Sequence, residues 1–182
     1  MKRLLVAGAL VLAGLVPAAA QQAADPQNTI FLDTKDGRIT IRLRPDLAPK
    51  HVEQIKTLTK QGFYNGVPFH RVIEGFMAQT GDPTGTGTGK SNLPDVPAEF
   101  TSTQYKRGSV GMARSSNPNS ANSQFFICYE GCGPLTGQYT LFGEVVSGMD
   151  VVDKIKKGNS AANGMVQSPD KIVKMQLAAD AK

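Results

Sequence analysis

The stretch TIFLDTKDGRITIRLR, residues 29–44, decides the fold class, because two strand-like runs flank the turn sequence KDG at 35–37. In the second run Ile39, Ile41 and Leu43 alternate with polar residues, and strict alternation is typical of a strand with one buried face. Asp-Gly between two such runs is a strong signal for a β-hairpin. We therefore expect the folded part of the chain to begin with two antiparallel strands.

Two helices are predicted after this hairpin. The first begins at Pro49, which suits a first helical turn, carries apolar residues at three-residue intervals, and ends near Gly62, which suits a C-terminal cap. The second and shorter helix is predicted within SGMDVVDKIKKG, 147–158, where Ser147 and Asp150 form a capping-box pattern.

The remaining chain consists of short strand-like runs separated by Gly, Pro, Asn and Ser clusters. Helices are too few to alternate with these strands, which disfavours a doubly wound α/β sheet. The pattern predicts a mainly β fold, an antiparallel barrel or sandwich. The predicted strands are PFHRVI (68–73), GFMAQT (75–80), GSVGMA (108–113), SQFFICY (123–129), YTLFGEVV (139–146) and IVKMQL (172–177).

The first twenty residues have the pattern of a secretory signal peptide. Lys2 and Arg3 precede an uncharged run over 4–16, and a group of small residues ends at Ala20. A membrane-spanning helix needs about 20 apolar residues, which is more than this run provides. We expect cleavage after Ala20, export to a periplasm or out of the cell, no membrane association after cleavage, and a single domain over 21–182.

The charge of the chain does not favour a nucleic-acid partner. The formal net charge is +5, and loss of Lys2 and Arg3 with the leader leaves +3. So small and scattered a charge indicates neither nucleic-acid binding nor binding to a membrane surface. The chain also has no Trp that could stack on nucleic-acid bases. We expect a monomer.

Two cysteines, Cys128 and Cys132, would meet an oxidising compartment if the chain is exported, so a disulfide between them has to be considered. Closure depends on a Cα distance that the sequence does not give, and we favour a buried, unpaired Cys128. His51 and His70 are far apart in sequence, so a zinc site of usual spacing is not supported and we expect no metal.

A glycine-rich segment, GDPTGTGTGKSN at 81–92, is close to a phosphate-binding loop. The pattern G-x-x-x-x-G-K-[ST] would require glycine at the position of Thr84. Pro94 and Pro97 also disfavour the helix that has to follow such a loop. A nucleotide-binding enzyme is therefore disfavoured.

Two strands repeat the same combination of side chains. Met77 and Gln79 are two residues apart and share one strand face, and Gln124 and Phe126 do the same in the later strand. An interior face rarely holds two amides, because each one left unpaired would cost a few kcal/mol or so. Parity alone leaves two interpretations open, a solvated sheet face and a binding groove.

Three blocks of the chain, in order and spacing, resemble the signature blocks of the cyclophilin-type peptidyl-prolyl cis/trans isomerases. They are FHRVIEGFMAQTGDPTGTGTG (69–89), GSVGMARSSNPNSANSQFFI (108–127) and LTGQYTLFGEVVSGMDVV (135–152). The resemblance covers roughly 30–177. It implies a closed eight-stranded antiparallel β-barrel capped by two α-helices, and isomerisation of Xaa-Pro bonds in proline-containing peptides and unfolded protein clients, without a cofactor. A proline-peptide-binding chaperone or scaffold remains the alternative.

Carried over residue by residue, the resemblance implies that Arg71 is catalytic. An apolar pocket would hold the proline ring, glutamines and main-chain groups would bind the substrate backbone, and one glycine of the rich segment would line the groove. The implied substrate-binding residues are Phe76, Met77, Gln79, Gly85, Gly87, Ala113, Arg114, Gln124, Phe126, Leu135 and Tyr139.

Three positions depart from the pattern of many eukaryotic members. Pro134 stands where they carry Trp, Tyr139 where they carry His, and Arg114 where they often carry Asn. Since the Trp position helps to bind cyclosporin in the family, the resemblance implies weak sensitivity to that drug.

Overall fold

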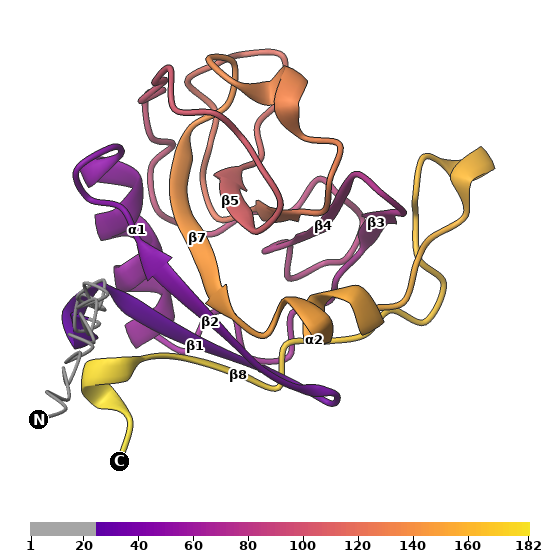
Figure 1. Cartoon of the computed structure of the whole chain (residues 1–182), viewed down its shortest axis with the longest axis horizontal. Coiled ribbons are helices and arrows are strands. Elements are labelled where there is room, and N and C mark those ends of the chain that lie inside the picture. Colours follow the sequence, from indigo (N-terminus) through magenta and orange to yellow (C-terminus); the bar gives the residue numbers. More distant parts are fainter. Residues whose placement is uncertain (1–24) are drawn as a thin grey trace, which may run out of the picture.

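The predicted hairpin opens the sheet in the computed structural model, which describes residues 25–182 (Figure 1). Strands β1 (Thr29–Thr34) and β2 (Gly37–Leu43) pair antiparallel, as the alternating pattern predicted. Residues 1–20, predicted to be a signal peptide, lie outside the described residues.

Six further strands complete one antiparallel sheet, in the order β3-β4-β6-β5-β7-β2-β1-β8. The predicted mainly β, antiparallel architecture is confirmed, because each predicted strand-like run overlaps one of them. These strands are β3 (Arg71–Ile73), β4 (Met77–Thr80), β5 (Ser109–Met112), β6 (Phe125–Cys128), β7 (Leu141–Ser147) and β8 (Lys174–Leu177).

The barrel is less completely closed than expected. Within residues 25–182 the end strands β3 and β8 share no ladder, and irregular segments cross the gap between them. Gly66 N–H donates to the Ile172 carbonyl at 2.7 Å and Phe69 N–H to the Asp170 carbonyl at 2.9 Å. Pro68, between the two donors, has no N–H and cannot extend a regular ladder.

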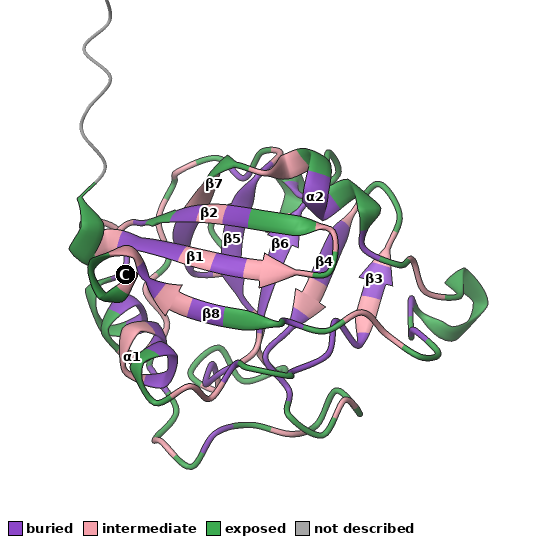
Figure 2. Cartoon of the chain, turned by 90° about the horizontal axis from the view of Figure 1, so that it is seen from below, coloured by how far each residue is buried: buried purple, intermediate pink, exposed green. Residues whose placement is uncertain are grey.

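The first helix, α1 (Pro49–Lys60), lies at one end of the sheet (Figure 2). Its N-terminus is capped from a distant loop, because the Glu99 carboxylate accepts hydrogen bonds from the backbone N–H groups of Lys50 (3.2 Å) and His51 (3.1 Å). Gly62 follows the helix with φ +70°, a conformation that suits glycine and agrees with the predicted cap.

The second helix, α2 (Met149–Lys154), lacks the predicted capping box of Ser147 and Asp150. Ser147 is the last residue of β7, and the N-cap position belongs to Gly148, which has φ +90°. A Cβ at this position would lie 2.3 Å from the Arg38 carbonyl oxygen. The close approach of the two backbones therefore requires glycine, and a glycine cannot offer a capping side chain.

Alternate residues of β6 enter different apolar clusters. Phe125 and Ile127 are fully buried in the main core inside the barrel. All eight strands and both α-helices contribute side chains to this core. Phe126 and Cys128 belong to a smaller cluster on the other face of the same strand. This outer cluster underlies the candidate site.

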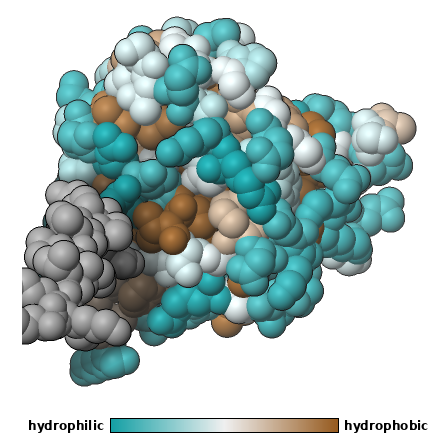
Figure 3. Space-filling view, in the orientation of Figure 1, coloured by the Kyte–Doolittle hydropathy of each residue, from teal (hydrophilic) through white to brown (hydrophobic). Residues whose placement is uncertain are grey.

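No helix within the described part of the chain is long and apolar enough to cross a membrane. Residues 25–182 also contain no cluster of three or more His, Cys, Asp or Glu side chains placed to bind a metal ion. The face seen in Figure 3 is largely hydrophilic, with its hydrophobic residues in small groups.

Candidate functional site

The guanidinium group of Arg71, the first residue of β3, is held from two sides. Its Nε and Nη2 donate to the main-chain and side-chain oxygens of Asn163, each at 3.0 Å, and Nη1 donates to Gln79 Oε1 at 3.1 Å. Within residues 25–182 these bonds leave two of the five N–H donors without an oxygen acceptor. Burial lowers the pKa of Arg71, but a guanidinium titrates so high that it stays charged.

Two amide side chains continue this network across the sheet. Gln79 lies opposite Arg71 in the β3–β4 pair, and its Nε2 donates to Gln124 Oε1 at 2.9 Å. Gln124 in turn donates to the carbonyl oxygens of Gly87 (3.0 Å) and Gly89 (2.9 Å). The two glutamines therefore form a hydrogen-bonded polar row that ends at Arg71, and both line a cavity described below.

A cavity of about 170 Å³, lined by a majority of apolar and aromatic residues and hereafter called the apolar cavity, lies beside this row. Phe126 forms one wall and meets Tyr139 edge to face at 5.9 Å between ring centroids. The Arg114 guanidinium lies over the Tyr139 ring, with Cζ 4.4 Å from the ring centroid. The cavity is lined by Arg71, Phe76, Met77, Gln79, Ala113, Arg114, Phe126, Leu135 and Tyr139.

A second, larger cavity of about 490 Å³ adjoins the first, and the two share Gln79, Ala113 and Arg114. Its other lining residues are mostly polar, so together the cavities form a groove with an apolar end and a polar end. These others are Gly87, Thr88, Gly89, Lys90, Asp95, Ser115, Ser120, Asn122 and Gln124.

The glycine-rich segment forms one wall of the polar end and is built around a carboxylate of its own. Asp82, fully buried, accepts hydrogen bonds from the backbone N–H of Thr84 (2.7 Å) and of Gly87 (2.6 Å). Burial alone would raise the pKa of Asp82, but these hydrogen bonds outweigh it and lower the pKa. An anion from the chain itself thus fills the place that a phosphate takes in nucleotide-binding loops.

The structure separates the two glycines that the resemblance left as alternatives. Gly87 lines the larger cavity, whereas Gly85 lines neither cavity and faces Pro68, whose Cγ would lie 3.2 Å from a Cβ at position 85. All the other predicted site residues line one cavity or both. Gly85 lines neither of these two cavities, so its part in the groove stays a prediction.

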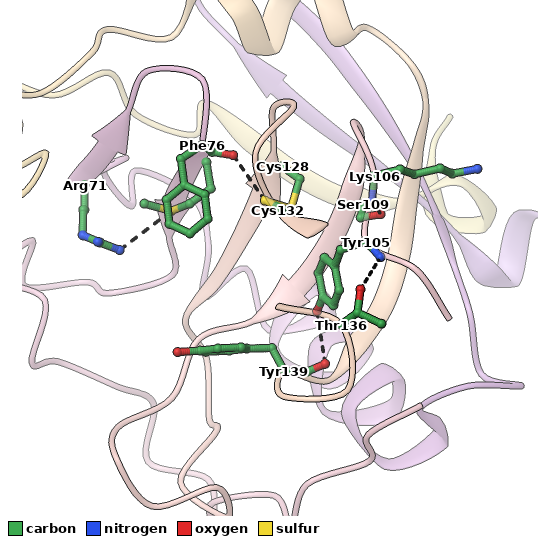
Figure 4. Close-up of a disulfide and its surroundings, with 10 residues drawn as sticks. Arg71, Phe76, Tyr105, Lys106, Ser109, Cys128, Cys132, Thr136 and Tyr139 are labelled. Carbon is green, nitrogen blue, oxygen red and sulfur yellow. Dashed lines mark hydrogen bonds between the residues drawn. A yellow bond between two sulfur atoms is a disulfide. The ribbon is translucent and has the colours of Figure 1, made fainter. Parts of the chain in front are cut away.

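Cys128 and Cys132 form a disulfide, so the expectation of an unpaired Cys128 is wrong. The disulfide belongs to the same apolar cluster as Phe126 and Leu135, which line the apolar cavity. The Cα atoms lie 5.9 Å apart, a normal distance for a disulfide. Cys132 Sγ lies 3.2 Å from the carbonyl oxygen of Phe76, and Figure 4 shows Phe76 between Arg71 and the disulfide. The turn that closes the pair depends on Gly131, where a Cβ would lie 2.9 Å from the Gly75 carbonyl oxygen.

The disulfide also fixes the segment that carries the far wall of the cavity. Leu135 N–H donates to the Cys132 carbonyl at 2.9 Å, and Tyr139 N–H donates to the Leu135 carbonyl at 3.1 Å. Both walls of the apolar cavity are therefore connected to the sheet through β6, one directly by Phe126 and one through the disulfide.

Sequence reasoning missed two residues of the site, Asn163 and Asp82. Asn163 is separated from Arg71 by 92 positions, and the only local signal was the turn dipeptide Asn163-Gly164. The role of Asp82 was not predicted, because the glycine-rich pattern around it resembles a loop that binds an external phosphate rather than a carboxylate of the same chain.

Comparison with known proteins identifies relatives of the whole described domain. The family model described as "Cyclophilin type peptidyl-prolyl cis-trans isomerase/CLD" matches residues 29–177. A protein of Brucella suis biovar 1 (strain 1330), named "Probable peptidyl-prolyl cis-trans isomerase", is 57% identical, and the match covers 98% of this chain and 96% of that protein.

Two solved structures are similar in fold. The cyclophilin AquaCyp293 from Hirschia baltica superposes with a TM-score of 0.76 at 28% identity, covering 87% of this chain and 77% of that one. A Cryptosporidium parvum cyclophilin-type isomerase, determined in the presence of the dipeptide Ala-Pro, has a TM-score of 0.74 at 28% identity, covering 82% of this chain and 98% of that one.

Proposed function

Because the chain belongs to the cyclophilin-type peptidyl-prolyl cis-trans isomerase family, we propose that Arg71 is the group that accelerates rotation of the Xaa-Pro bond. The observation that carries this proposal is the guanidinium beside the 170 Å³ cavity. Three of its N–H groups are held by protein oxygens, Nη1 also lies 4.0 Å from Met77 Sδ, and one N–H on Nη2 has no partner within residues 25–182.

The chemistry of the reaction fits a fixed cation. An Xaa-Pro bond must lose its amide resonance to rotate, over a barrier of about 18 to 20 kcal/mol, and unaided rotation takes tens to hundreds of seconds. In the twisted amide the prolyl nitrogen regains a lone pair and becomes a hydrogen-bond acceptor. A permanently charged N–H donor next to that nitrogen stabilises the twisted state more than the planar one.

The surrounding groups hold the rest of the substrate. The cavity between Phe126, Met77 and Leu135 takes the proline ring, and the Gln79–Gln124 row offers amide groups to the peptide backbone. Preferential stabilisation of the twisted state by about 7 kcal/mol would accelerate rotation roughly 10⁵-fold. The scheme involves no covalent intermediate.

We test the role of Arg71 by measuring cis-trans exchange of an Ala-Pro peptide by NMR with the wild type and Arg71→Ala. The matched control is Arg38→Ala, which removes an exposed arginine paired with Asp33 in the hairpin. We expect Arg71→Ala to lose most of the activity and Arg38→Ala to retain it. Equal activity in the wild type and Arg71→Ala would contradict the proposal.

The second part of the proposal is that the protein acts on exported proteins as they fold. It is supported by the leader-like residues 1–20 and by the Cys128–Cys132 disulfide, since disulfides persist in oxidising compartments such as the bacterial periplasm. Expression of the full chain in a Gram-negative host, fractionation and N-terminal sequencing test it. We expect a periplasmic protein that begins at Gln21, and an uncleaved cytosolic protein would contradict this.

A proline-peptide-binding chaperone is the second candidate function, and the larger polar cavity favours it because it extends the groove beyond the proline pocket. In that case Arg71→Ala would still suppress aggregation of an unfolded client while exchange of the Ala-Pro peptide falls. Loss of both properties in Arg71→Ala would exclude an independent chaperone function.

A further inference from the structure

We infer that Asn163 is a positioning residue for Arg71, a role that rests on the proposed function of Arg71. Asn163 is the only residue in the described part of the chain that binds Arg71 through two oxygens. Its main-chain carbonyl accepts from Nε and its Oδ1 accepts from Nη2, each at 3.0 Å. These two donors form one edge of the planar guanidinium, so Asn163 fixes the plane of the group as well as its position.

The backbone conformation of Asn163 allows this double contact. With φ 53° and ψ 35° the residue is left-handed, at the C-terminal end of the 3₁₀-helix Ser160–Ala162. Asparagine adopts this conformation more readily than most residues with a Cβ, because its short polar side chain can hydrogen-bond locally. Here the carbonyl oxygen and Oδ1 of one residue face the same guanidinium edge.

The segment that carries Asn163 is fastened to β3 on both sides of Arg71. Val166 N–H donates to the carbonyl of His70 (3.0 Å), and Val72 N–H donates to the carbonyl of Gly164 (2.8 Å). The segment between α2 and β8 thus runs along the outer edge of β3, where Figures 1 and 2 show it extending past the sheet.

Close backbone contact makes this attachment tight. A Cβ at Gly164, which has φ +78°, would lie 2.4 Å from Ile73 Cγ1. A Cβ at Gly158 would lie 1.8 Å from the carbonyl oxygen of Gly164. The two glycines bring the turn against the strand, and the residue next to Gly164 is therefore held in fixed register with Arg71.

The arrangement divides the binding of Arg71 between two structures. Gln79 holds Nη1 from inside the sheet, and Asn163 holds the opposite edge from a separate turn. If the Oδ1 contact is removed, the guanidinium is held only by the Asn163 main-chain oxygen, Gln79 Oε1 and the weak Met77 Sδ contact, and its plane beside the cavity is less firmly fixed. Misplacement of a catalytic group costs rate rather than ground-state binding, because the contact matters most in the transition state.

The test compares two substitutions at position 163 with a matched control. Asn163→Gly keeps the left-handed backbone and the main-chain acceptor but loses Oδ1, whereas Asn163→Asp keeps a side-chain oxygen. Ser168→Gly is the control, because Ser168 also has a positive φ (49°) and lies in the same segment. Kinetic constants for an Ala-Pro peptide and the NMR signals of the Arg71 Nη protons are measured for each.

We expect Asn163→Gly to lower kcat about tenfold with KM within twofold of the wild type. The Arg71 Nη signals should merge as rotation becomes faster, and Asn163→Asp should restore both properties while Ser168→Gly changes neither. Rates are expressed per folded molecule, so that reduced stability cannot imitate the effect.

A kcat for Asn163→Gly within twofold of the wild type would overturn the inference, and so would a rise in KM alone. Arg71→Ala, assayed in parallel, separates this outcome from failure of the proposed function. If Arg71→Ala loses activity and Asn163→Gly does not, only the positioning role fails. If Arg71→Ala is fully active, the proposed function fails.

Discussion

Two neighbouring phenylalanines on β6 belong to very different regions of the molecule. Phe125 is fully buried inside the barrel, among apolar side chains such as Tyr64 and Phe142, which meet its ring edge to face. Phe126 is almost as well buried, at 4% exposure, but its neighbours Tyr105 and Tyr139 belong to the outer cluster at the candidate site.

The difference shows how one strand serves two purposes. The interior cluster joins residues from β1 to β8 and both helices, so it determines the fold. The outer cluster is small, includes a disulfide and lies below the row from Arg71 to Gln124, so it shapes a surface cavity. Because successive side chains of a strand point to opposite faces, neighbouring residues of β6 contribute one to the core and the next to the surface cavity.

The largest expected effect on stability comes from truncating the inner ring. Phe125→Ala should lower the free energy of unfolding by about 3–5 kcal/mol, because it leaves a cavity that the packed interior cannot fill. Phe126→Ala should cost clearly less, since its cavity opens into the groove, but should weaken binding of an Ala-Pro peptide. Urea unfolding and NMR titration measure the two properties, and equal stability losses would contradict the separation.

A smaller effect is expected from opening the disulfide beneath the outer cluster. The loop closed by Cys128 and Cys132 is short, so reduction should lower the free energy of unfolding by about 2 kcal/mol, near the low end for disulfides. The Leu135–Tyr139 wall should also become more mobile. Urea unfolding with and without reductant measures this, and a Cys128→Ala, Cys132→Ala double variant is the control that should not respond to reductant.

The smallest expected effect is the change of stability with pH, and it again depends on which face of the sheet a side chain occupies. Arg71 carries a charge on the outer face, whereas the adjacent His70 is 1% exposed and turned inward. Burial lowers the pKa of His70 from 6.5, so the unfolded chain binds the proton more readily than the folded one. Stability should therefore be fully present above pH 6.5 and fall as the pH drops below it.

Comparison of wild type with His70→Gln between pH 7.5 and 5 tests this expectation. Part of the pH dependence should remain in His70→Gln, because burial also lowers the pKa of His51. An unchanged pH dependence in His70→Gln would show that the interior tolerates a charged His70.

Much of the fold followed from local patterns in the sequence. The period-two alternation near Ile39 and Ile41 predicted the hairpin, and the parity of Gln79 and Gln124 placed both amides on one face. These features depend only on neighbours along the chain, so a single sequence is sufficient to find them.

The parts that could not be predicted depend on distances between segments. Pairing of Cys128 with Cys132 requires the tight turn at Gly131, and the contact of Asn163 with Arg71 requires a turn that packs along β3. The predicted capping box of α2 was wrong for the same reason, because no pattern in the neighbouring sequence indicates that Gly148 lies against the β1–β2 hairpin. Roles of residues in the groove came from family resemblance rather than from spacing.

The most direct test of the central claim separates rotation on the protein from binding. NMR line shapes of an Ala-Pro peptide at saturating protein give the rate of cis-trans interconversion in the bound state, and a titration gives its affinity. We predict that Arg71→Ala lowers the bound-state rate by about 100-fold or more, as expected for loss of a transition-state contact of about 3 kcal/mol, while affinity changes only a few-fold. An unchanged bound-state rate with lost affinity would show that Arg71 only binds the substrate and would contradict the account.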